Sequence, residues 1–258
     1  MRSIAVCLAV VAAIMPFTAR PADRYEGLAY VRGSDRLVYR EVHWLYVKDG
    51  VAQQLVLYHC PDGAPFARRL IRELPNAIAP DFDFLDGRDG RHEGVRTQAG
   101  GREVFYQENK ESPLRTARLA ARPEGVIDAG FDAFVRAHWD ELSRDDSLEA
   151  PFLVPSRLEF LDFRIFDAQN GLWHGRKVLR VRMGLAAWYA FALPSIELTY
   201  EPHDRHLLEY QGIGAISDSR GRNQNVRIEF PDGARASGLP LDEVRPAATA
   251  PLTGRCFG

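Results

Sequence analysis

The chain has 258 residues, with 33 Lys or Arg against 35 Asp or Glu and a formal net charge of −2. This balance supplies no basic field for a nucleic acid, and the composition is that of a globular protein and not of a disordered one. Length alone allows one large β-rich domain or two small ones.

The N-terminal segment has the layout of a secretory signal peptide. Arg2 precedes a nearly continuous apolar run over 4–17, and Ala19 and Ala22 offer candidate cleavage positions. The run is too short to span a membrane as a helix. We therefore expect residues 1–22 to be a signal peptide and the protein to be periplasmic or secreted. The alternative is an uncleaved N-terminal anchor, which would be its one attachment to a membrane.

Two cysteines, Cys60 and Cys256, remain after the signal segment. An even number of cysteines in an oxidising compartment favours a disulfide. Such a bridge would close a loop of nearly the whole mature chain. The alternative is two free thiols, because a sequence does not show whether two residues lie within bonding distance.

The segment from Tyr25 to Cys60 predicts three strands, because β-branched, aromatic and other bulky residues alternate and cluster along it. Asp49-Gly50 predicts a tight hairpin between the second and third strands, since both residues tolerate a positive φ. The stretch 66–74 (FARRLIREL) fits a helix or a strand, and its position between turn signals favours a strand.

The next stretch, 75–101, is rich in Asp, Gly, Pro and Arg and is typical of a long loop with one short strand. A loop of that length is uncommon unless it is functional or mobile. Residues 102–108 (REVFYQE) and 114–121 (LRTARLAA) then predict two further strands.

One segment, 128–144, predicts an amphipathic helix. Apolar side chains recur along it at intervals of three and four residues, and Asp128 is placed to cap its first turn. Three of the apolar side chains, Phe131, Phe134 and Trp139, are large, so the helix needs a broad apolar surface to pack against. Because the chain on both sides predicts strands, we expect that surface to be a sheet.

The C-terminal half predicts more strands. Alternating residues mark strands over 161–165 and 179–183, and 195–230 is typical of an antiparallel meander. The apolar stretch 185–194 (LAAWYAFALP) fits a short helix or a buried strand. The tail, 236–258, is rich in Pro, Gly and Ala and predicts irregular structure.

These elements predict an α+β fold in which antiparallel β structure predominates. We expect one domain over 23–235, built as a strongly twisted sheet that forms an open or half barrel and packs around one central amphipathic helix. The signal segment and the irregular tail would flank this domain.

The chain carries no motif for covalent catalysis. A Gly-x-Ser-x-Gly elbow, a Gly-rich phosphate loop with Lys-Ser or Lys-Thr and a Cys-x-x-Cys pair are all absent from the sequence. His203 and His206 would suit a metal site on a helix, but a turn between strands makes them solvated turn residues. The sequence therefore predicts no cofactor and no metal, and it favours a protein without enzymatic activity but leaves that question open.

One polar site would change that prediction. Glu41, His43 and His59 all lie on the first hairpin. A two-residue loop at Asp49-Gly50 would put His43 and His59 on opposite faces of the sheet, whereas a three-residue loop would put both on one face. A hydrolase-type enzyme that uses these three residues is therefore a third functional hypothesis.

Six phrases carry a resemblance that spans most of the chain after the signal segment. They are LVYREVHW, VLYHCPDGAPFARRL, DFDFLDGRDGRHEGV, GFDAFVRAHWDEL, FLVPSRLEFLDFRI and LTYEPHDRHLLEYQGIGAISD. Together they resemble an exported bacterial family of unknown function, which assigns no activity. The architecture is also similar, distantly, to the half-barrels of LolA and LolB, periplasmic carriers that hold lipoprotein acyl chains between a curved sheet and helices. No lipid-binding residue carries over, because no short motif matches.

We therefore hypothesise that the protein binds a hydrophobic or lipid-like ligand in the concave face of its sheet, without covalent chemistry. The expected ligand-binding residues are Trp44, Phe134, Trp139 and Phe163. The alternative is a structural or interaction protein of the cell envelope, with an unknown envelope partner, whose concavity the helix fills. The two hypotheses differ in the apolar space that remains between helix and sheet.

Overall fold

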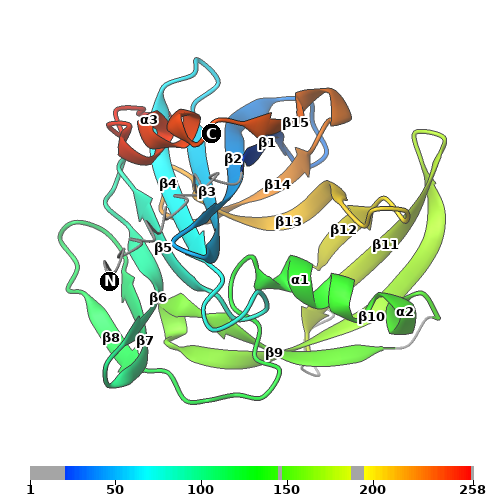
Figure 1. Cartoon of the computed structure of the whole chain (residues 1–258), viewed down its shortest axis with the longest axis horizontal. Helices are drawn as coiled ribbons and strands as arrows, with labels where there is room; N and C mark the ends of the chain where they lie inside the picture. Colours follow the sequence, from blue (N-terminus) through cyan, green and yellow to red (C-terminus); the bar gives the residue numbers. More distant parts are fainter. Residues whose placement is uncertain (1–20, 145–146, 187–194, 257–258) are drawn as a thin grey trace, which may run out of the picture.

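The computed structural model of the protein describes residues 21–144, 147–186 and 195–256. In these ranges the chain forms one 15-stranded antiparallel sheet with a few short helices (Figure 1). The predicted class, a mainly antiparallel α+β fold, is confirmed at this level.

The first half of the sheet is a meander in which each strand pairs with the next along the chain. Its strands are β1 (Ala22–Val31), β2 (Leu37–Lys48), β3 (Val51–His59), β4 (Pro65–Arg72), β5 (Asp81–Asp86), β6 (His92–Gln98), β7 (Gly101–Gln107) and β8 (Arg115–Arg118). The tight turn at Asp49-Gly50 joins β2 to β3 with positive φ at both residues, as predicted. The stretch 66–74 falls mostly in β4, which confirms the preference for a strand.

The second half of the sheet is another meander. Its strands are β9 (Leu148–Val154), β10 (Glu159–Trp173), β11 (Arg176–Leu185), β12 (Ile196–Tyr200), β13 (Leu207–Ser217) and β14 (Asn223–Glu229). A short 3-10 helix, η1 (Pro155–Arg157), lies between β9 and β10. Because β14 pairs with β1, the two meanders share one sheet, whose edges are β8 and β9 and which is not closed.

The prediction of a long loop over 75–101 is wrong, since β5 and β6 lie within this range. Phe82 and Phe84 alternate toward the core and are 3% and 0% exposed. Asp81 is also buried in β5, and its charge is neutralised there by the guanidinium of Arg102 of β7, 2.9 Å from its carboxylate. A charged residue that is buried through a partner distant in the sequence interrupts the apolar alternation from which a strand is predicted.

The helical segment is shorter and more broken than the predicted helix over 128–144. It consists of α1 (Gly130–Ala137) and α2 (Trp139–Leu142), which meet at His138. The backbone of His138 has φ −101° and ψ 21°, outside the helical region. One continuous central helix is therefore replaced by two short ones.

Asp128 does not cap α1, which corrects the second part of that prediction. The N-cap position is Ala129, and no side-chain hydrogen bond caps the helix. Asp128 has a positive φ of 49°, and its carboxylate forms an ion pair with Arg69 of β4. The Asp128 carboxylate therefore contacts Arg69 of β4 and does not accept a hydrogen bond from the first turn of α1.

Gly130 begins α1 where the chain passes close to the backbone of Ile78. A Cβ atom added at Gly130 would lie 1.9 Å from the carbonyl oxygen of Ile78. We therefore expect Gly130→Ala to lower the free energy of unfolding by about 2 kcal/mol, as overpacking does elsewhere. Urea denaturation measures the change. Gly233→Ala is the control, since a Cβ there meets nothing within 4 Å, and equal losses in both variants would contradict the explanation.

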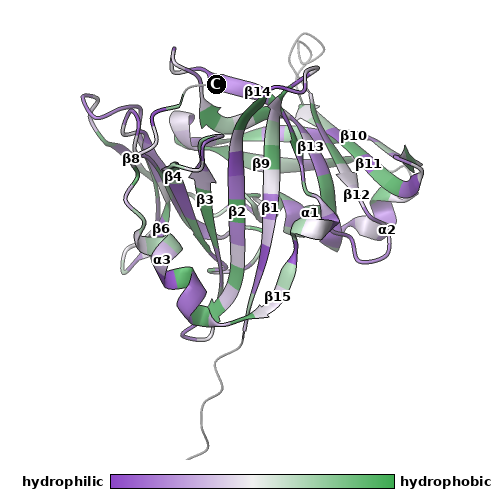
Figure 2. Cartoon of the chain, turned by 90° about the horizontal axis from the view of Figure 1, so that it is seen from above, coloured by the Kyte–Doolittle hydropathy of each residue, from purple (hydrophilic) through white to green (hydrophobic). Residues whose placement is uncertain are grey.

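The buried apolar side chains form three clusters. The largest joins β1–β7 to β9, β13 and β14 and includes Tyr39, Phe84 and Ile216. The second packs α1 and α2 against β10–β12. The third lies on the outer face of β2 and β3. The strands can carry apolar residues on both faces because both are covered, and Figure 2 shows hydrophilic and hydrophobic stretches in turn along β2.

The tail also contains regular structure, which corrects the prediction of an irregular segment over 236–258. Its elements are the strand β15 (Ala236–Leu239), which pairs with β1, the 3-10 helix η4 (Leu241–Glu243) and the helix α3 (Val244–Thr249). Another 3-10 helix, η3 (Asp232–Ala234), lies just before the tail. Val244 and Ala247 face the outer side of β2 and β3 and are 6% exposed each. Val244 and Ala247, three residues apart, pack α3 against the sheet. Two apolar residues among Pro and Ala do not give a helical pattern that the sequence alone reveals.

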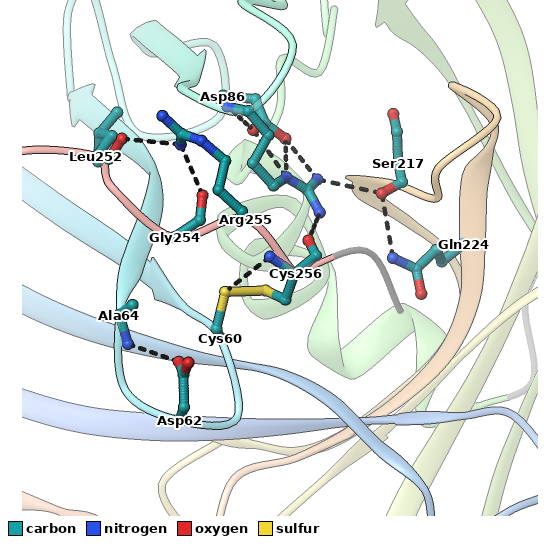
Figure 3. Close-up of a disulfide and its surroundings, with 11 residues drawn as sticks. Cys60, Asp62, Ala64, Asp86, Ser217, Gln224, Leu252, Gly254, Arg255 and Cys256 are labelled. Atoms are coloured by element: carbon teal, nitrogen blue, oxygen red, sulfur yellow. Dashed lines mark hydrogen bonds and ion pairs between the residues drawn. A yellow bond between two sulfur atoms is a disulfide. The ribbon is translucent and has the colours of Figure 1, made fainter.

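The predicted disulfide between Cys60 and Cys256 is present (Figure 3). The two residues are 196 positions apart in the sequence, and their Cα atoms lie 5.7 Å apart. Nearby, the Gly254 amide donates a hydrogen bond to the carbonyl oxygen of Pro65 at 2.8 Å. The bridge therefore ties the tail to the turn between β3 and β4.

Two predictions fall largely outside the described ranges: the signal segment up to residue 20, and residues 187–194 of the apolar stretch. Ala22, the last residue of the predicted signal segment, begins β1 and is fully buried. Cleavage after Ala19 would leave β1 whole. Within the part of the chain that the structure describes, no helix is long and apolar enough to cross a membrane.

Candidate functional site

The four predicted ligand-binding side chains do not share one surface. Phe134 and Trp139 lie in the cluster between the helices and β10–β12, and Phe163 packs at its border. Trp44 lies on the outer face of β2, in the cluster that α3 covers. Figure 1 shows α3 and the α1–α2 segment in separate parts of the molecule. The structure thus brings three of the four residues together and places Trp44 elsewhere.

The hollow of the second half of the sheet is filled by α1 and α2. Phe134 is 3% exposed, Trp139 7% and Leu142 0%. The indole of Trp139 meets the ring of Tyr200 on β12 edge-on, with ring centroids 6.0 Å apart. Side chains buried to this degree belong to a close-packed core. These three residues are therefore core and not the open wall of a cavity.

A row of partly buried phenylalanines borders this core. The rings of Phe152 and Phe163 lie 5.4 Å apart between centroids, and those of Phe131 and Phe152 lie 6.4 Å apart. The three side chains pack against the second cluster but are not fully buried. Of the predicted ligand-binding residues, only Phe163 belongs to this aromatic edge, and like Phe131 and Phe152 it is partly buried.

A polar cluster lies on the inner face of the first half of the sheet. The ring of His43 stacks on Tyr25 with centroids 4.3 Å apart, and its Nε2 lies 3.1 Å from Oε1 of Glu41. The amide nitrogen of Gln54 lies 2.9 Å from Nδ1 of His43 and donates a hydrogen bond to the Tyr25 hydroxyl at 3.0 Å. Burial raises the pKa of Tyr25, so this hydroxyl stays neutral and acts as a hydrogen-bonding group.

His59 does not join this cluster. His43 pairs with Val56 and His59 with Arg40, which is the register of a two-residue turn. His43 and His59 therefore point to opposite faces of the sheet. Burial also lowers the pKa of His59. Glu41 and His43 are brought together, but the third residue of the hydrolase-type hypothesis is not, so the arrangement lacks the second histidine that this hypothesis requires.

A buried ion pair connects the first half of the sheet to the helical segment. The Arg69 guanidinium and the Asp128 carboxylate lie 2.9 Å apart, and the two side chains are 12% and 13% exposed. The guanidinium also lies 5.0 Å from the centre of the Phe84 ring. Burial, the largest influence, would lower the pKa of Arg69, but Asp128 together with Tyr58, Glu93 and Glu41 outweighs it and raises that pKa. Arg69 therefore keeps its charge and holds the chain at the start of α1.

A second buried pair supports the disulfide. Arg88 and Asp86 lie 2.6 Å apart, with side chains only 1% and 2% exposed. Arg88 also donates hydrogen bonds to the carbonyl oxygens of Cys256, at 2.6 Å, and Ser217, at 3.1 Å. One guanidinium thus connects β5, β13 and the tail, which marks this cluster as structural.

A polar hollow of about 330 Å³ lies where the β5–β6 turn, β7, η1 and the β13–β14 turn meet. Arg91 in its lining donates hydrogen bonds to Ser217 Oγ at 3.2 Å and Asn223 Oδ1 at 2.9 Å, and it pairs with Glu93 at 2.8 Å. Because Arg91 already faces a carboxylate, the hollow suits a small uncharged polar ligand better than an anion.

The turn between β12 and β13 gathers three potential metal ligands. One ligand atom each of Glu201, Asp204 and His206 lies within 4.8 Å of the others. Although burial alone would raise it, hydrogen bonds from His206 lower the pKa of Asp204. The Glu201 carboxylate accepts a hydrogen bond from the backbone N–H of His203 at 2.6 Å. Contacts within the turn account for this grouping, and His203 is not part of it.

These features define a protein built on one open antiparallel sheet, against which its own helical segment packs. No protein-family model and no curated protein matches the chain. Among solved structures it is similar to a β-barrel-like protein of the domain of unknown function DUF1849 from Brucella abortus. The TM-score is 0.43 at 9% sequence identity, and the match covers 83% of this chain and 99% of the other. The likeness assigns no activity or ligand, and the resemblance to LolA and LolB stays a prediction.

Proposed function

We propose that the chain is a non-enzymatic protein of the bacterial cell envelope that acts structurally or through a partner on its surface. The observation that carries this proposal is the burial of Phe134, Trp139 and Leu142, each 7% exposed or less. A carrier that encloses an acyl chain between helix and sheet needs part of this apolar surface to be open. The filled hollow therefore favours the interaction protein over the lipid carrier.

The disulfide supports a place outside the cytoplasm. Disulfides form and persist in oxidising compartments and are rare in the cytosol, and Cys60 and Cys256 are bonded. The predicted signal segment, 1–22, supports the same location. A periplasmic or secreted protein agrees with both features.

A second candidate function keeps the hydrophobic ligand but moves it to the aromatic edge. Phe131, Phe152 and Phe163 form a continuous set of ring contacts that is only partly buried. Aromatic faces of this kind bind apolar groups with little loss of side-chain entropy. On this reading a small ligand lies beside the helical segment and not beneath it.

Native mass spectrometry and titration of a hydrophobic fluorescent probe test both candidates on protein purified from an exporting host. We expect no co-purified lipid and no saturable probe binding, because the hollow is filled. Saturable binding that Phe163→Ala removes and Trp44→Ala retains would favour the aromatic edge. Co-purified lipid whose binding is insensitive to Phe163→Ala would contradict the filled hollow.

A further inference from the structure

The hairpin of β10 and β11 projects from the sheet. β9 pairs with β10 only as far as Ile165, and β12 pairs with β11 only as far as Leu179. Among the described strands, the ladder beyond these points continues between β10 and β11 alone, up to the turn at His174-Gly175. Figure 1 shows the tip extending past β12. The last part of the hairpin is therefore a two-stranded arm.

The tip of this arm exposes apolar side chains. Leu172 is 65% exposed, more than the other exposed large apolar residues of the described chain. Trp173 follows it and is partly exposed. Arg176, on the other strand, forms an exposed ion pair with Asp232. One exposed leucine is ordinary on a protein surface. Leu172 and Trp173 are consecutive residues of β10 and point to opposite faces of the arm, so the narrow tip carries an apolar side chain on each face, and a partner that receives the tip end-on can cover both.

The arm is also basic, although the whole chain has a net charge of −2. No acidic residue occurs between Asp167 and Glu197 in the sequence. Lys177 is exposed and lies opposite Leu172 in the ladder. Arg180 is exposed and donates a hydrogen bond to the carbonyl oxygen of Leu172 at 2.9 Å. By the register of the ladder, Lys177 lies on the face of Leu172 and Arg180 on the face of Trp173, so one cation accompanies the apolar side chain on each face of the tip.

We propose that this tip docks on the surface of an anionic phospholipid bilayer. Tryptophan favours the boundary between headgroups and acyl chains, an adjacent leucine can enter the acyl region, and Lys and Arg are attracted to anionic headgroups. Leu172 and Trp173 supply the apolar contact, and Lys177 and Arg180 supply the charge. The inference adds a partner to the proposed envelope protein and rests on that proposal only for the location of the chain near a membrane.

Flotation with vesicles tests the inference on protein purified from an exporting host. Vesicles of phosphatidylglycerol and phosphatidylcholine should bind the protein, pure phosphatidylcholine should bind it weakly, and salt should reduce binding because exposed charges are screened. Lys177→Gln and Arg180→Gln should each lower the partition coefficient about fivefold. Leu172→Ser should lower it about tenfold through lost apolar contact. All variants share one N-terminus, so differences among them report on the arm.

Leu114→Ser and Lys48→Gln are matched controls in the first half of the sheet, since Leu114 is 48% exposed and Lys48 is exposed at the end of β2. Neither should change vesicle binding. Equal binding of all variants, or equal binding to neutral and anionic vesicles, would overturn the inference. A change of oligomeric state in Leu172→Ser with unchanged vesicle binding would also overturn it, because the tip would then contact a second copy. Probe titration tests the proposed function separately, so either can fail alone.

Discussion

Replacement of Cys60 and Cys256 by alanine should lower the free energy of unfolding by about 5 kcal/mol. The bridge joins residues 196 positions apart, and the entropy that a cross-link removes from the unfolded chain increases with the length of the closed loop. The effect should appear as an earlier midpoint in urea denaturation.

The loss should begin at the tail. Without the bridge, the tail is held by the cluster under α3 and by hydrogen bonds such as that from Arg88 to the Cys256 carbonyl oxygen. Hydrogen exchange in α3 and β15 should therefore rise before exchange in β2 and β3.

A thiol reductant provides the control for this prediction. It should shift the wild-type midpoint to that of the double-alanine variant and leave the variant unchanged. Equal midpoints for the oxidised wild type and the variant would contradict a stabilising bridge.

The other large effect is expected at Asp128. Asp128→Asn should lower the free energy of unfolding by about 3 kcal/mol, because Arg69 would stay charged and buried without its counter-ion. Asparagine has nearly the same shape and tolerates the positive φ of 49° at this position. The substitution therefore removes the charge and changes little else.

Two further variants separate this effect from a general cost of substitution. Arg69→Met combined with Asp128→Asn should recover most of the loss, because no buried charge then lacks a partner. Glu149→Gln breaks the pair with Arg164, whose side chains are 55% and 52% exposed, and should change stability by about 0.5 kcal/mol or less. Equal losses at Asp128 and Glu149 in thermal or urea denaturation would show that the Arg69 pair has no special weight.

Local patterns were sufficient for many strands. The Asp49-Gly50 turn and the meander over 195–230 follow from turn chemistry and alternation, which act over a few residues. The strand β5 did not follow, because the charge of Asp81 is neutralised by Arg102 on another strand. The prediction that Asp128 caps the helix was wrong for the same reason. An aspartate at this position can cap a helix or form an ion pair, and only the position of Arg69 in the fold decides between the two.

The candidate site was difficult to predict from the sequence for a different reason. Alternation along β2 already separates Trp44 from His43, because neighbouring residues of a strand point to opposite faces. It does not say which face is concave, since both faces of β2 carry large apolar residues. The outer face is covered by α3, and the composition of the tail concealed that helix. The accessible aromatic edge depends in turn on how far α1 and α2 fill the hollow, which is a property of packing and not of local pattern.

The pairing of β1 with β14 affects the order in which the strands of the sheet pair during folding. Within each meander a strand finds its partner nearby in the sequence, whereas the pairing of Leu28 with Glu229 joins the two ends of the domain. Such a contact costs more loop-closure entropy and forms late. Because the chain is synthesised from its N-terminus, one edge of β1 stays unpaired until the last strands have been made. Unpaired edges invite wrong partners, so the interval between the emergence of β1 and of β14 is when the protein is most prone to aggregate.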